Sequence, residues 1–306
     1  MRCLVFGGSG FLGSHLVEAL LEERHQVLNF DLDPLCISID NKRYTYYRGD
    51  IRDEGIVFRA IYDFMPECVY IFSAVHDIES CEKDPYGTFD INILGLINIL
   101  TAISDMTDRE EIKQGKMTIS KVISASSMYA NSANHPYGIT KLAGELLLKW
   151  YAKKYNFPYI ILRFGTVYGP RAGENNGLRR FVKGAIDKGV IEHYGTGREV
   201  REYIHVKDVA RSCIDLMEEE DNETFVITGA ESIKSSQLCV LLQEMMSETG
   251  LYSSINFNKE VKQDGHYEAT PYRYKITAIK KYTPTKVVDF GSGLLELVEE
   301  LKYDEK

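Results

Sequence analysis

A tyrosine and a lysine four positions apart are the strongest candidates for acid/base chemistry in this sequence. Tyr137 and Lys141 lie in the run Pro-Tyr-Gly-Ile-Thr-Lys, at the start of a helix predicted over residues 137–155. Residues at positions i and i+4 share one helix face, one turn apart. A lysine ammonium beside a phenol is expected to lower its pKa from about 10, which favours proton exchange near neutral pH. Many amphipathic helices carry such a pair, so other features must support it.

Three serines stand close upstream of this pair. Ser124, Ser126 and Ser127 lie at the end of a strand predicted over Lys121 to Ala125. Ligands of open α/β sheets bind at the carboxyl ends of the strands, so a hydroxyl group here could hydrogen-bond a substrate oxygen. Serines that only form a turn are the alternative.

A glycine-rich loop near the N-terminus predicts a dinucleotide site. It fits the patterns G-x-G-x-x-G and G-x-x-G-x-x-G, and it falls between an apolar run at Cys3–Phe6 and a helical pattern over Phe11–Leu21. In that position the helix N-terminus offers free N–H groups to a pyrophosphate, whereas glycines that only shape a loop need no such flanks. The glycines are Gly7, Gly8, Gly10 and Gly13.

Asp31 ends a second predicted strand, Gln26–Phe30. A carboxylate there accepts hydrogen bonds from the adenosine ribose hydroxyls and repels a 2′-phosphate, so the sequence predicts NAD rather than NADP. A cation folding back onto this aspartate would reverse that preference. The cations near enough in sequence are Arg24, Lys42 and Arg43.

Asp50 and Ile51 follow the third predicted strand, Tyr44–Arg48, and are candidates to hold the adenine. Alternatively, Asp50 caps the turn that leads into Arg52 and Asp53.

Strand and helix patterns alternate along the first half of the chain, which predicts an α/β fold with a doubly wound parallel sheet. Further strands are expected at Cys68–Ser73 and Tyr159–Leu162, and the alternation ends after Pro170. We therefore expect a dinucleotide-binding domain over residues 1–170, rejoined by 204–228, and a substrate lobe over 171–203 and 229–306. Two long predicted helices, 87–104 and 137–155, carry more apolar residues than one buried face needs and could pair in a homodimer. The polar stretch Thr107–Gly115 is expected to be a surface excursion.

The charge and composition of the chain disfavour several classes of partner. The net charge of −9 disfavours nucleic acid, and the first apolar run is too short for a signal peptide or a membrane span, so we expect a cytoplasmic protein. The six cysteines form no C-x-x-C pair and stand at no metal-ligand spacing with histidine, which favours free thiols and no metal.

Together these motifs make the chain resemble the extended short-chain dehydrogenase/reductases, the NAD-dependent nucleotide-sugar epimerase and dehydratase family. The resemblance runs nearly from end to end. It includes Gly7–Gly13, Gly49–Asp53, Asn92 in Asp-Ile-Asn-Ile-Leu-Gly, Pro136–Lys141, Leu162-Arg163, Val167–Arg171, Gly195–Gly197 and Arg201–Asp208.

The resemblance implies roles for single residues. Tyr137 exchanges the hydroxyl proton, Lys141 holds the nicotinamide ribose, and a serine orients the sugar oxygen. Alignment on the strand makes that serine Ser127, whereas counting back from Tyr129 gives Ala125; we prefer Ser127. The expected NAD contacts are Gly7, Gly10, Phe11, Leu12, Gly13, Asp31, Asp50, Ile51, Phe72, Ser73, Ala74, Asn92, Tyr137 and Lys141.

On the substrate side, the resemblance implies that Arg201 and Arg273 hold a diphosphate, although each could be an ordinary surface cation. Thr166 replaces an asparagine that is common in the family. The segment from Tyr129 to Tyr137 is shorter than usual, so the wall of the sugar pocket is trimmed or rebuilt. The expected substrate contacts are Ser126, Thr166, Asn176, Arg201 and Arg273.

The expected function is therefore an epimerase that acts on a nucleotide-sugar, with C4 as the favoured carbon. Met128-Tyr129 stands where 4,6-dehydratases carry Asp-Glu, so elimination of water is disfavoured. A reductase or dehydrogenase of a keto-sugar is the alternative within the enzyme class. A nucleotide sensor without catalysis is a further alternative, disfavoured by the intact Tyr137 and Lys141.

Overall fold

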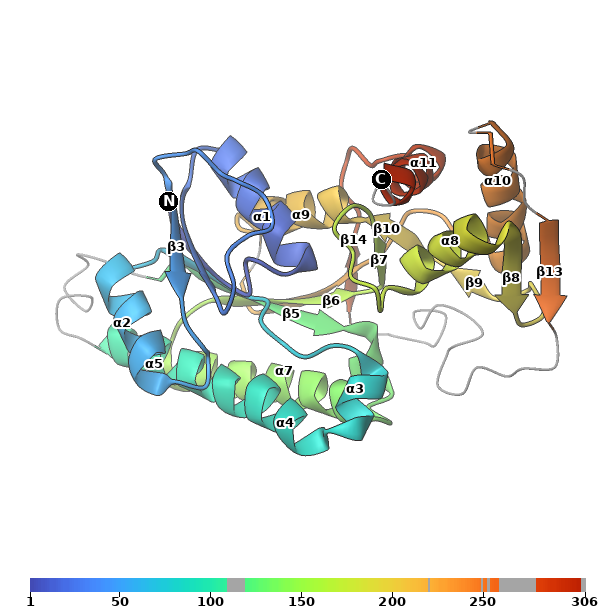
Figure 1. Ribbon diagram of the computed structural model, residues 1–306. Coiled ribbons are helices and arrows are strands. Elements are labelled where there is room, and N and C mark those ends of the chain that lie inside the picture. Colours follow the sequence, from blue (N-terminus) through green and yellow to red (C-terminus); the bar gives the residue numbers. More distant parts are fainter. Residues whose placement is uncertain (109–118, 220, 249, 252–253, 259–278, 304–306) are drawn as a thin grey trace. The chain divides into compact units, whose positions relative to one another are not determined.

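The computed structural model describes the chain except residues 109–118, 220, 249, 252–253, 259–278 and 304–306 (Figure 1). The predicted excursion after Thr107 therefore lies largely outside the described residues. The chain forms two compact units: the first is Met1–Phe164 with Ala210–Val226, and the second is Gly165–Val209 with Ile227–Lys306. These boundaries fall within about six residues of those expected from the sequence.

Seven strands of the large, eight-stranded sheet lie mainly within the residues of the first unit. Their order across the sheet is β11-β6-β5-β4-β1-β2-β3. Strands β1 to β6 pair in parallel, as the alternating pattern predicts. Because β1 has β2 on one side and β4 on the other, the strand order reverses there, which is where such sheets bind ligands. The strands are β1 (Arg2–Phe6), β2 (Gln26–Asp31), β3 (Tyr44–Arg48), β4 (Cys68–Ile71), β5 (Lys121–Ser127), β6 (Tyr159–Phe164) and β11 (Glu223–Ile227).

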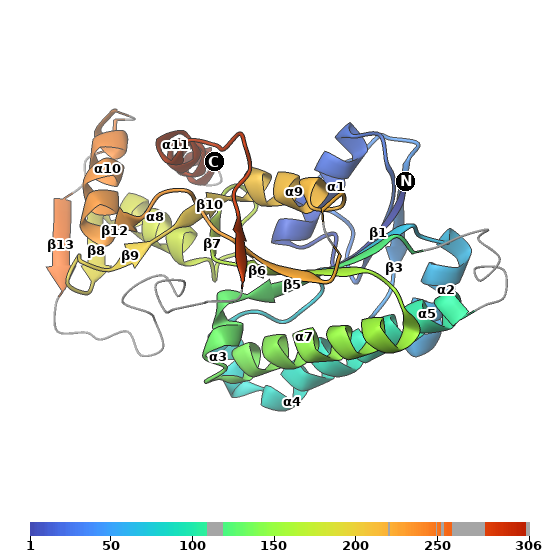
Figure 2. The same cartoon turned by 180° about the vertical axis from the view of Figure 1, so that it is seen from behind.

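Helices cover both faces of this sheet (Figures 1 and 2). Helix α1 (Phe11–Glu22) lies on one face, and α2 (Glu54–Phe64), α5 (Leu96–Asp108) and α7 (Pro136–Tyr155) lie on the other. The core is built from apolar side chains of the strands and of these helices, among them Leu4, Phe6, Leu100, Ile103 and Ile161. Strand β1 is fully apolar after Arg2 because both of its faces are buried.

The helix expected over 87–104 is three consecutive segments: α4 (Pro85–Phe89), η1 (Asp90–Gly95) and α5. The middle segment, η1, is a π-helix, a wide turn that often marks functional sites. Helix α3 (Ile78–Lys83) precedes them, and the 3₁₀ turn η2 (Met128–Asn131) follows β5.

The described residues of the second unit form three two-stranded sheets and several helices, which fits the loss of alternation after Pro170. Strand β7 (Thr166–Tyr168) pairs with β10 (Tyr203–His205), β8 (Val190–Tyr194) with β13 (Ser254–Asn258), and β9 (Val200–Arg201) with β12 (Ile233–Lys234). Its helices α8 (Gly177–Lys188), α10 (Ser235–Glu248) and α11 (Phe290–Tyr303) enclose a second core that includes Val182, Leu242 and Leu297. Helix α9 (Val206–Asp215) leads back to the first unit, and β14 is Lys280–Tyr282.

Candidate active site

The glycine loop forms a cradle for phosphate at the carboxyl end of β1. Gly7 has a φ of +83°, which only glycine adopts readily, and a Cβ on Gly13 would overlap the Gly7 carbonyl oxygen. Gly10 is the N-cap of α1 and offers no side-chain cap, so Phe11 and Leu12 begin the helix with amide groups that no capping side chain occupies. The residues present therefore fit a dinucleotide pyrophosphate, which such amides bind together with the helix dipole.

Asp31 lies at the end of β2, beside this cradle. Its carboxylate accepts the backbone N–H groups of Ser9 at 2.9 Å and Leu32 at 2.7 Å. Partial burial raises the Asp31 pKa, and these backbone donors oppose the rise. The backbone N–H of Asp33 also stabilises this carboxylate, so one of its about four lone-pair positions remains for a ribose hydroxyl. One cation that we did not single out, Arg48, stands opposite Asp31 in the β2–β3 register.

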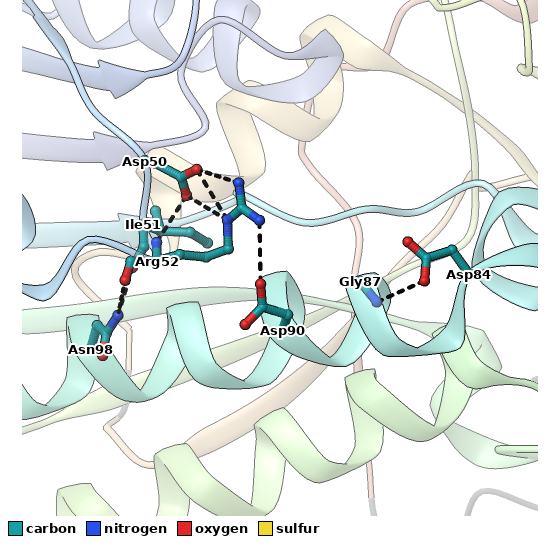
Figure 3. Close-up of polar contacts among 7 residues, drawn as sticks. All are labelled: Asp50, Ile51, Arg52, Asp84, Gly87, Asp90 and Asn98. Carbon is teal, nitrogen blue, oxygen red and sulfur yellow. Dashed lines mark hydrogen bonds and ion pairs between the residues drawn. The ribbon is translucent and has the colours of Figure 1, made fainter.

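The Asp50-Ile51 pair lies at the end of β3. The Asp50 carboxylate accepts the backbone N–H of Arg52 at 2.9 Å, so Asp50 does form the turn cap that we considered as an alternative. The Arg52 guanidinium also bonds this carboxylate and lowers the Asp50 pKa (Figure 3). The Ile51 side chain is buried, and its carbonyl accepts the Asn98 side chain at 2.9 Å. A role of this pair toward adenine stays a prediction.

The segment Phe72-Ser73-Ala74 passes next to the glycine loop, because a Cβ on Gly7 would lie 2.5 Å from the Ser73 nitrogen. Asn92, on η1, fixes the residue that follows: it accepts from the Val75 N–H at 2.8 Å and donates to the Val75 carbonyl at 2.9 Å. Asn92 thus fixes the backbone directly after Phe72-Ser73-Ala74, the segment that is expected to contact the cofactor. Ser73, Ala74 and Asn92 line a cavity of about 30 Å³ together with Ser124, Lys141 and Glu145.

Tyr137 and Lys141 come together with one of the three serines. The Ser127 side chain is near enough to the Tyr137 phenol to lower its pKa, and the Ser127 hydroxyl caps η2 by accepting from the Tyr129 N–H at 3.2 Å. The Lys141 ammonium lies 5.7 Å from the centre of the Tyr137 ring and donates to the Ala125 carbonyl at 3.1 Å. Of the three serines, Ser127 is the one that lies near the Tyr137 phenol. This supports our preference for Ser127 as the serine that orients the sugar oxygen.

Ser126, expected to touch substrate, is buried and donates its hydroxyl proton to Glu145 at 2.5 Å. Ser124 lines the cavity described above.

The expected drop in the Tyr137 pKa is wrong for this structure. Desolvation raises the Tyr137 pKa to about 12, and the hydrogen bond from Ser127 only partly opposes this rise. Desolvation also lowers the Lys141 pKa to about 8, against the opposing effects of Glu145 and Cys81. Helical spacing places the two side chains near each other, but it does not show how far each is removed from water.

A buried ion pair lies one helical turn beyond Lys141, and sequence reasoning missed it. Arg163 on β6 donates to both carboxylate oxygens of Glu145, each at 2.7 Å, and to the side chain of Asn131. The two charged side chains are 9% and 3% exposed. The signal was an arginine inside the apolar run Tyr159–Phe164, since a charge there requires a partner.

His135 was also missed. It is buried and is the N-cap of α7, where its Nδ1 accepts the Gly138 N–H at 3.1 Å. Its ring lies parallel to that of Tyr137, with centres 6.2 Å apart, and meets Tyr129 edge-on. The rings of Tyr129, His135 and Tyr137 therefore contact one another within this segment. A histidine directly before a proline at a helix start was the available signal.

The expected substrate contacts of the second unit lie on separate elements. Thr166 begins β7, and Arg201 is half-buried on β9, where its Nη1 donates to the Val200 carbonyl at 3.0 Å. Asn176 caps α8 through its oxygen and donates to the Val167 carbonyl at 2.9 Å. Arg273 lies outside the described residues. The substrate roles of all four stay predictions.

Comparison with known proteins agrees with this geometry. The model of the NAD dependent epimerase/dehydratase family matches residues 3–228. A Methanocaldococcus jannaschii protein named "Putative UDP-glucose 4-epimerase" is 28% identical over 99% of both chains. The UDP-glucose 4-epimerase of Thermotoga maritima, solved with UDP-glucose, is 26% identical over 100% of both chains with a TM-score of 0.79.

The UDP-glucuronic acid 4-epimerase of Bacillus cereus, solved with UDP-glucuronic acid and NAD, has the same TM-score of 0.79 at 24% identity and covers 99% of each chain. The expected α/β fold and the family resemblance are both confirmed. A phosphate cradle, a strand-end aspartate and a Ser-Tyr-Lys group stand on one parallel sheet, and the family model spans all of them. The chain belongs to the NAD-dependent epimerase/dehydratase family, whose cofactor is NAD.

Proposed function

We propose that the protein is a nucleotide-sugar 4-epimerase. The observation that carries this proposal is that Ser127, Tyr137 and Lys141 lie together. The Lys141 Nζ is 5.7 Å from the Tyr137 ring centre, Ser127 is near enough to the phenol to lower its pKa, and the same sheet carries the glycine cradle. Similarity to UDP-sugar 4-epimerases over the full chain supports the choice of reaction. The identity of the sugar and of its nucleotide is left to experiment.

NAD bound in the glycine cradle would supply a nicotinamide ring able to take a hydride from a sugar carbon and give it back. Side chains of the protein accept the proton of the sugar hydroxyl group and later return it. With a pKa of about 12, the Tyr137 phenol is protonated at neutral pH in this structure, so it must first release its proton to solvent before it can accept the hydroxyl proton of the sugar. The Ser127 hydroxyl and the Lys141 ammonium both stabilise a phenolate, the first by donating a hydrogen bond and the second by its charge. When the hydride returns, the phenol gives its proton back to the sugar oxygen.

Two rival reactions are less well supported. Dehydration needs an additional acid and base, and Met128 and Tyr129 follow Ser127 where they would stand; Met128 is also buried. Net reduction of a keto-sugar commonly uses NADPH, and the carboxylate of Asp31 repels a 2′-phosphate. A sensor would not need the Ser-Tyr-Lys arrangement.

In the second unit, we assign Arg201 to the substrate diphosphate. Its Nη1 donates to the Val200 carbonyl at 3.0 Å. The other N–H groups of the planar guanidinium have a geometry that suits hydrogen bonds to phosphate oxygens.

A second copy of the chain is the partner that we propose. Large apolar side chains are exposed on two helices that pack together, with Tyr86 at 85%, Leu94 at 52% and Leu146 at 59% exposed. The stretch Pro85–Thr107 is long and apolar enough to cross a membrane, but half of its most apolar window is buried within the protein. Sedimentation of the protein and of Leu146→Glu tests the assignment: a dimer that the variant dissociates supports it, and a monomer in both contradicts it.

The direct test of the reaction is NMR of purified protein mixed with UDP-, GDP- and dTDP-sugars. Inversion at C4 of one of them, absent with Tyr137→Phe, supports the proposal. Release of water or a net change in NADH with product formation contradicts it.

A further inference from the structure

His135 carries a buried hydrogen-bond donor beside the phenol that the proposed reaction uses. Its Nδ1 accepts the Gly138 N–H at 3.1 Å, so that nitrogen carries no proton and the proton of the neutral imidazole is on Nε2. The residue is 6% exposed, and no group in the described part of the chain accepts a hydrogen bond from Nε2. A buried donor without an acceptor destabilises a fold, so a ligand oxygen that accepts from it would bind favourably.

The His135 ring is held at a fixed position against Tyr137. The two rings are parallel, with 2° between their planes and 6.2 Å between their centres. Tyr129 meets the His135 ring edge-on, with centres 5.0 Å apart. The segment packs closely against the start of α7, because a Cβ on Gly138 would lie 2.8 Å from the Tyr129 carbonyl oxygen. A hexose with one hydroxyl at the Tyr137 phenol is wide enough to place another of its oxygens at His135.

The charges around His135 favour an uncharged acceptor. Burial lowers the pKa of His135 from its usual value, and the Glu82 carboxylate opposes this change. The ring is therefore uncharged at neutral pH and offers an N–H dipole rather than a positive charge. Glu82 is exposed on α3, which packs against α7, and its negative charge would repel a sugar carboxylate at this position.

We propose that His135 is a substrate-binding residue that donates its Nε2–H to an uncharged oxygen of the sugar, other than the oxygen at Tyr137. The acceptor is a hydroxyl group or an amide carbonyl. Neutral hexoses and N-acetylhexosamines are then the substrate class, and uronic acids are disfavoured. The inference rests on the proposed function, because it requires a sugar at Tyr137, and it specifies the substrates of that function.

The test is calorimetric titration of the NAD-loaded protein with UDP and with UDP-linked glucose, N-acetylglucosamine and glucuronic acid. We expect the better of the two neutral sugars to bind at least about tenfold more tightly than the uronic acid. Forms of UDP-glucose that lack the hydroxyl at C2, C3 or C6 locate the acceptor, because loss of the right oxygen should weaken binding about 5- to 30-fold. If the acceptor is the amide carbonyl, the N-acetyl group carries this difference instead.

His135→Ser keeps the cap of α7, because serine is favoured at that position, and removes the distant donor. It should weaken binding of the neutral sugar about 5- to 30-fold and leave the affinities for UDP and NAD unchanged. The difference made by the missing oxygen should fall below about twofold in this variant, as in a double-mutant cycle. His135→Asn also caps helices and holds its N–H groups nearer the backbone, so it should have the same effect and covers the case in which His135→Ser fails to fold.

His25→Ser is the matched control, because His25 is half-buried directly before β2, where its Nδ1 lies 3.3 Å from the N-terminal amine. It should keep every ratio.

Equal or tighter binding of UDP-glucuronic acid by the unaltered protein overturns the inference. So does a His135→Ser protein that binds UDP and the UDP-sugars more weakly in the same proportion, because a merely structural role has that result. Unchanged affinity of this variant for all of them overturns it as well. Binding is measured separately from turnover, so a protein that shows the expected binding without inverting C4 retains the inference and loses the proposed function.

Discussion

Replacement of Arg163 by methionine is expected to lower the free energy of unfolding by about 4 kcal/mol. The change removes two hydrogen bonds of 2.7 Å to the carboxylate of Glu145, and hydrogen bonds to charged groups contribute about 1.5–3 kcal/mol each. Removing one partner of a buried pair costs about 3–5 kcal/mol, because it leaves the other charge buried. With side chains only 9% and 3% exposed, water cannot replace the lost contacts.

A double-mutant cycle separates this loss from simple loss of packing. Glu145→Leu with Arg163→Met removes both charges, so we expect the double variant to lie within about 2 kcal/mol of the unaltered protein, the remainder reflecting the contacts of Ser126 and Asn131. Urea unfolding at one fixed protein concentration, followed by circular dichroism, measures the difference. Fluorescence of Trp150, the single tryptophan, reports on the same helix as Glu145. A single-variant loss below about 1 kcal/mol, or additive losses in the double variant, would refute the reasoning.

Three further predictions concern ligands and pH. The protein should bind NAD at least about tenfold more tightly than NADP, because Asp31 opposes a 2′-phosphate; titration of both cofactors checks this, and equal affinity would remove the assigned role of Asp31. Arg201→Ala should weaken binding of UDP or another nucleoside diphosphate by about 2–4 kcal/mol and leave NAD binding unchanged, and an unaltered diphosphate affinity in the folded variant would make this arginine a surface cation. Lys141 has a pKa lowered to about 8, so its ammonium is present below that pH and is lost as pH rises through it. Turnover that depends on the charge should decline there, whereas a pH–rate profile that is flat from pH 7 to about 9 would show that the charge is not needed.

The strands and turns that carry the expected cofactor contacts could be predicted from the sequence, because their signals are local. The glycine loop and Asp31 are each tied to the end of a predicted strand, and parallel strands bring their ends to one edge. The strand over Tyr44–Arg48 has the expected bounds, which placed Asp50 directly after it.

Features that depend on contacts between distant segments were not predictable. Glu145 and Arg163 are separated by 18 positions, and no spacing rule links a helix residue to a residue on the next strand. The reversal of the Tyr137 pKa arises from burial, which helical spacing does not report. The π-helix at Asp90–Gly95 shifts the periodicity by a fraction of one turn, too little to distinguish from an ordinary helix.

The choice among Ser124, Ser126 and Ser127 likewise required the structure, because it rests on which hydroxyl meets Tyr137 and which meets Glu145.

In the proposed reaction, hydride leaves one sugar carbon and returns to the same carbon while Tyr137 moves the proton. Nucleotide-sugars carrying deuterium at C4 test this, with the product analysed by mass spectrometry and NADH followed by absorbance. We expect a C4 epimer that retains the deuterium, no net NADH, and a rate about 10²- to 10⁴-fold lower in Tyr137→Phe. Loss of the deuterium to solvent, NADH formed in step with product, or full activity in Tyr137→Phe would contradict it.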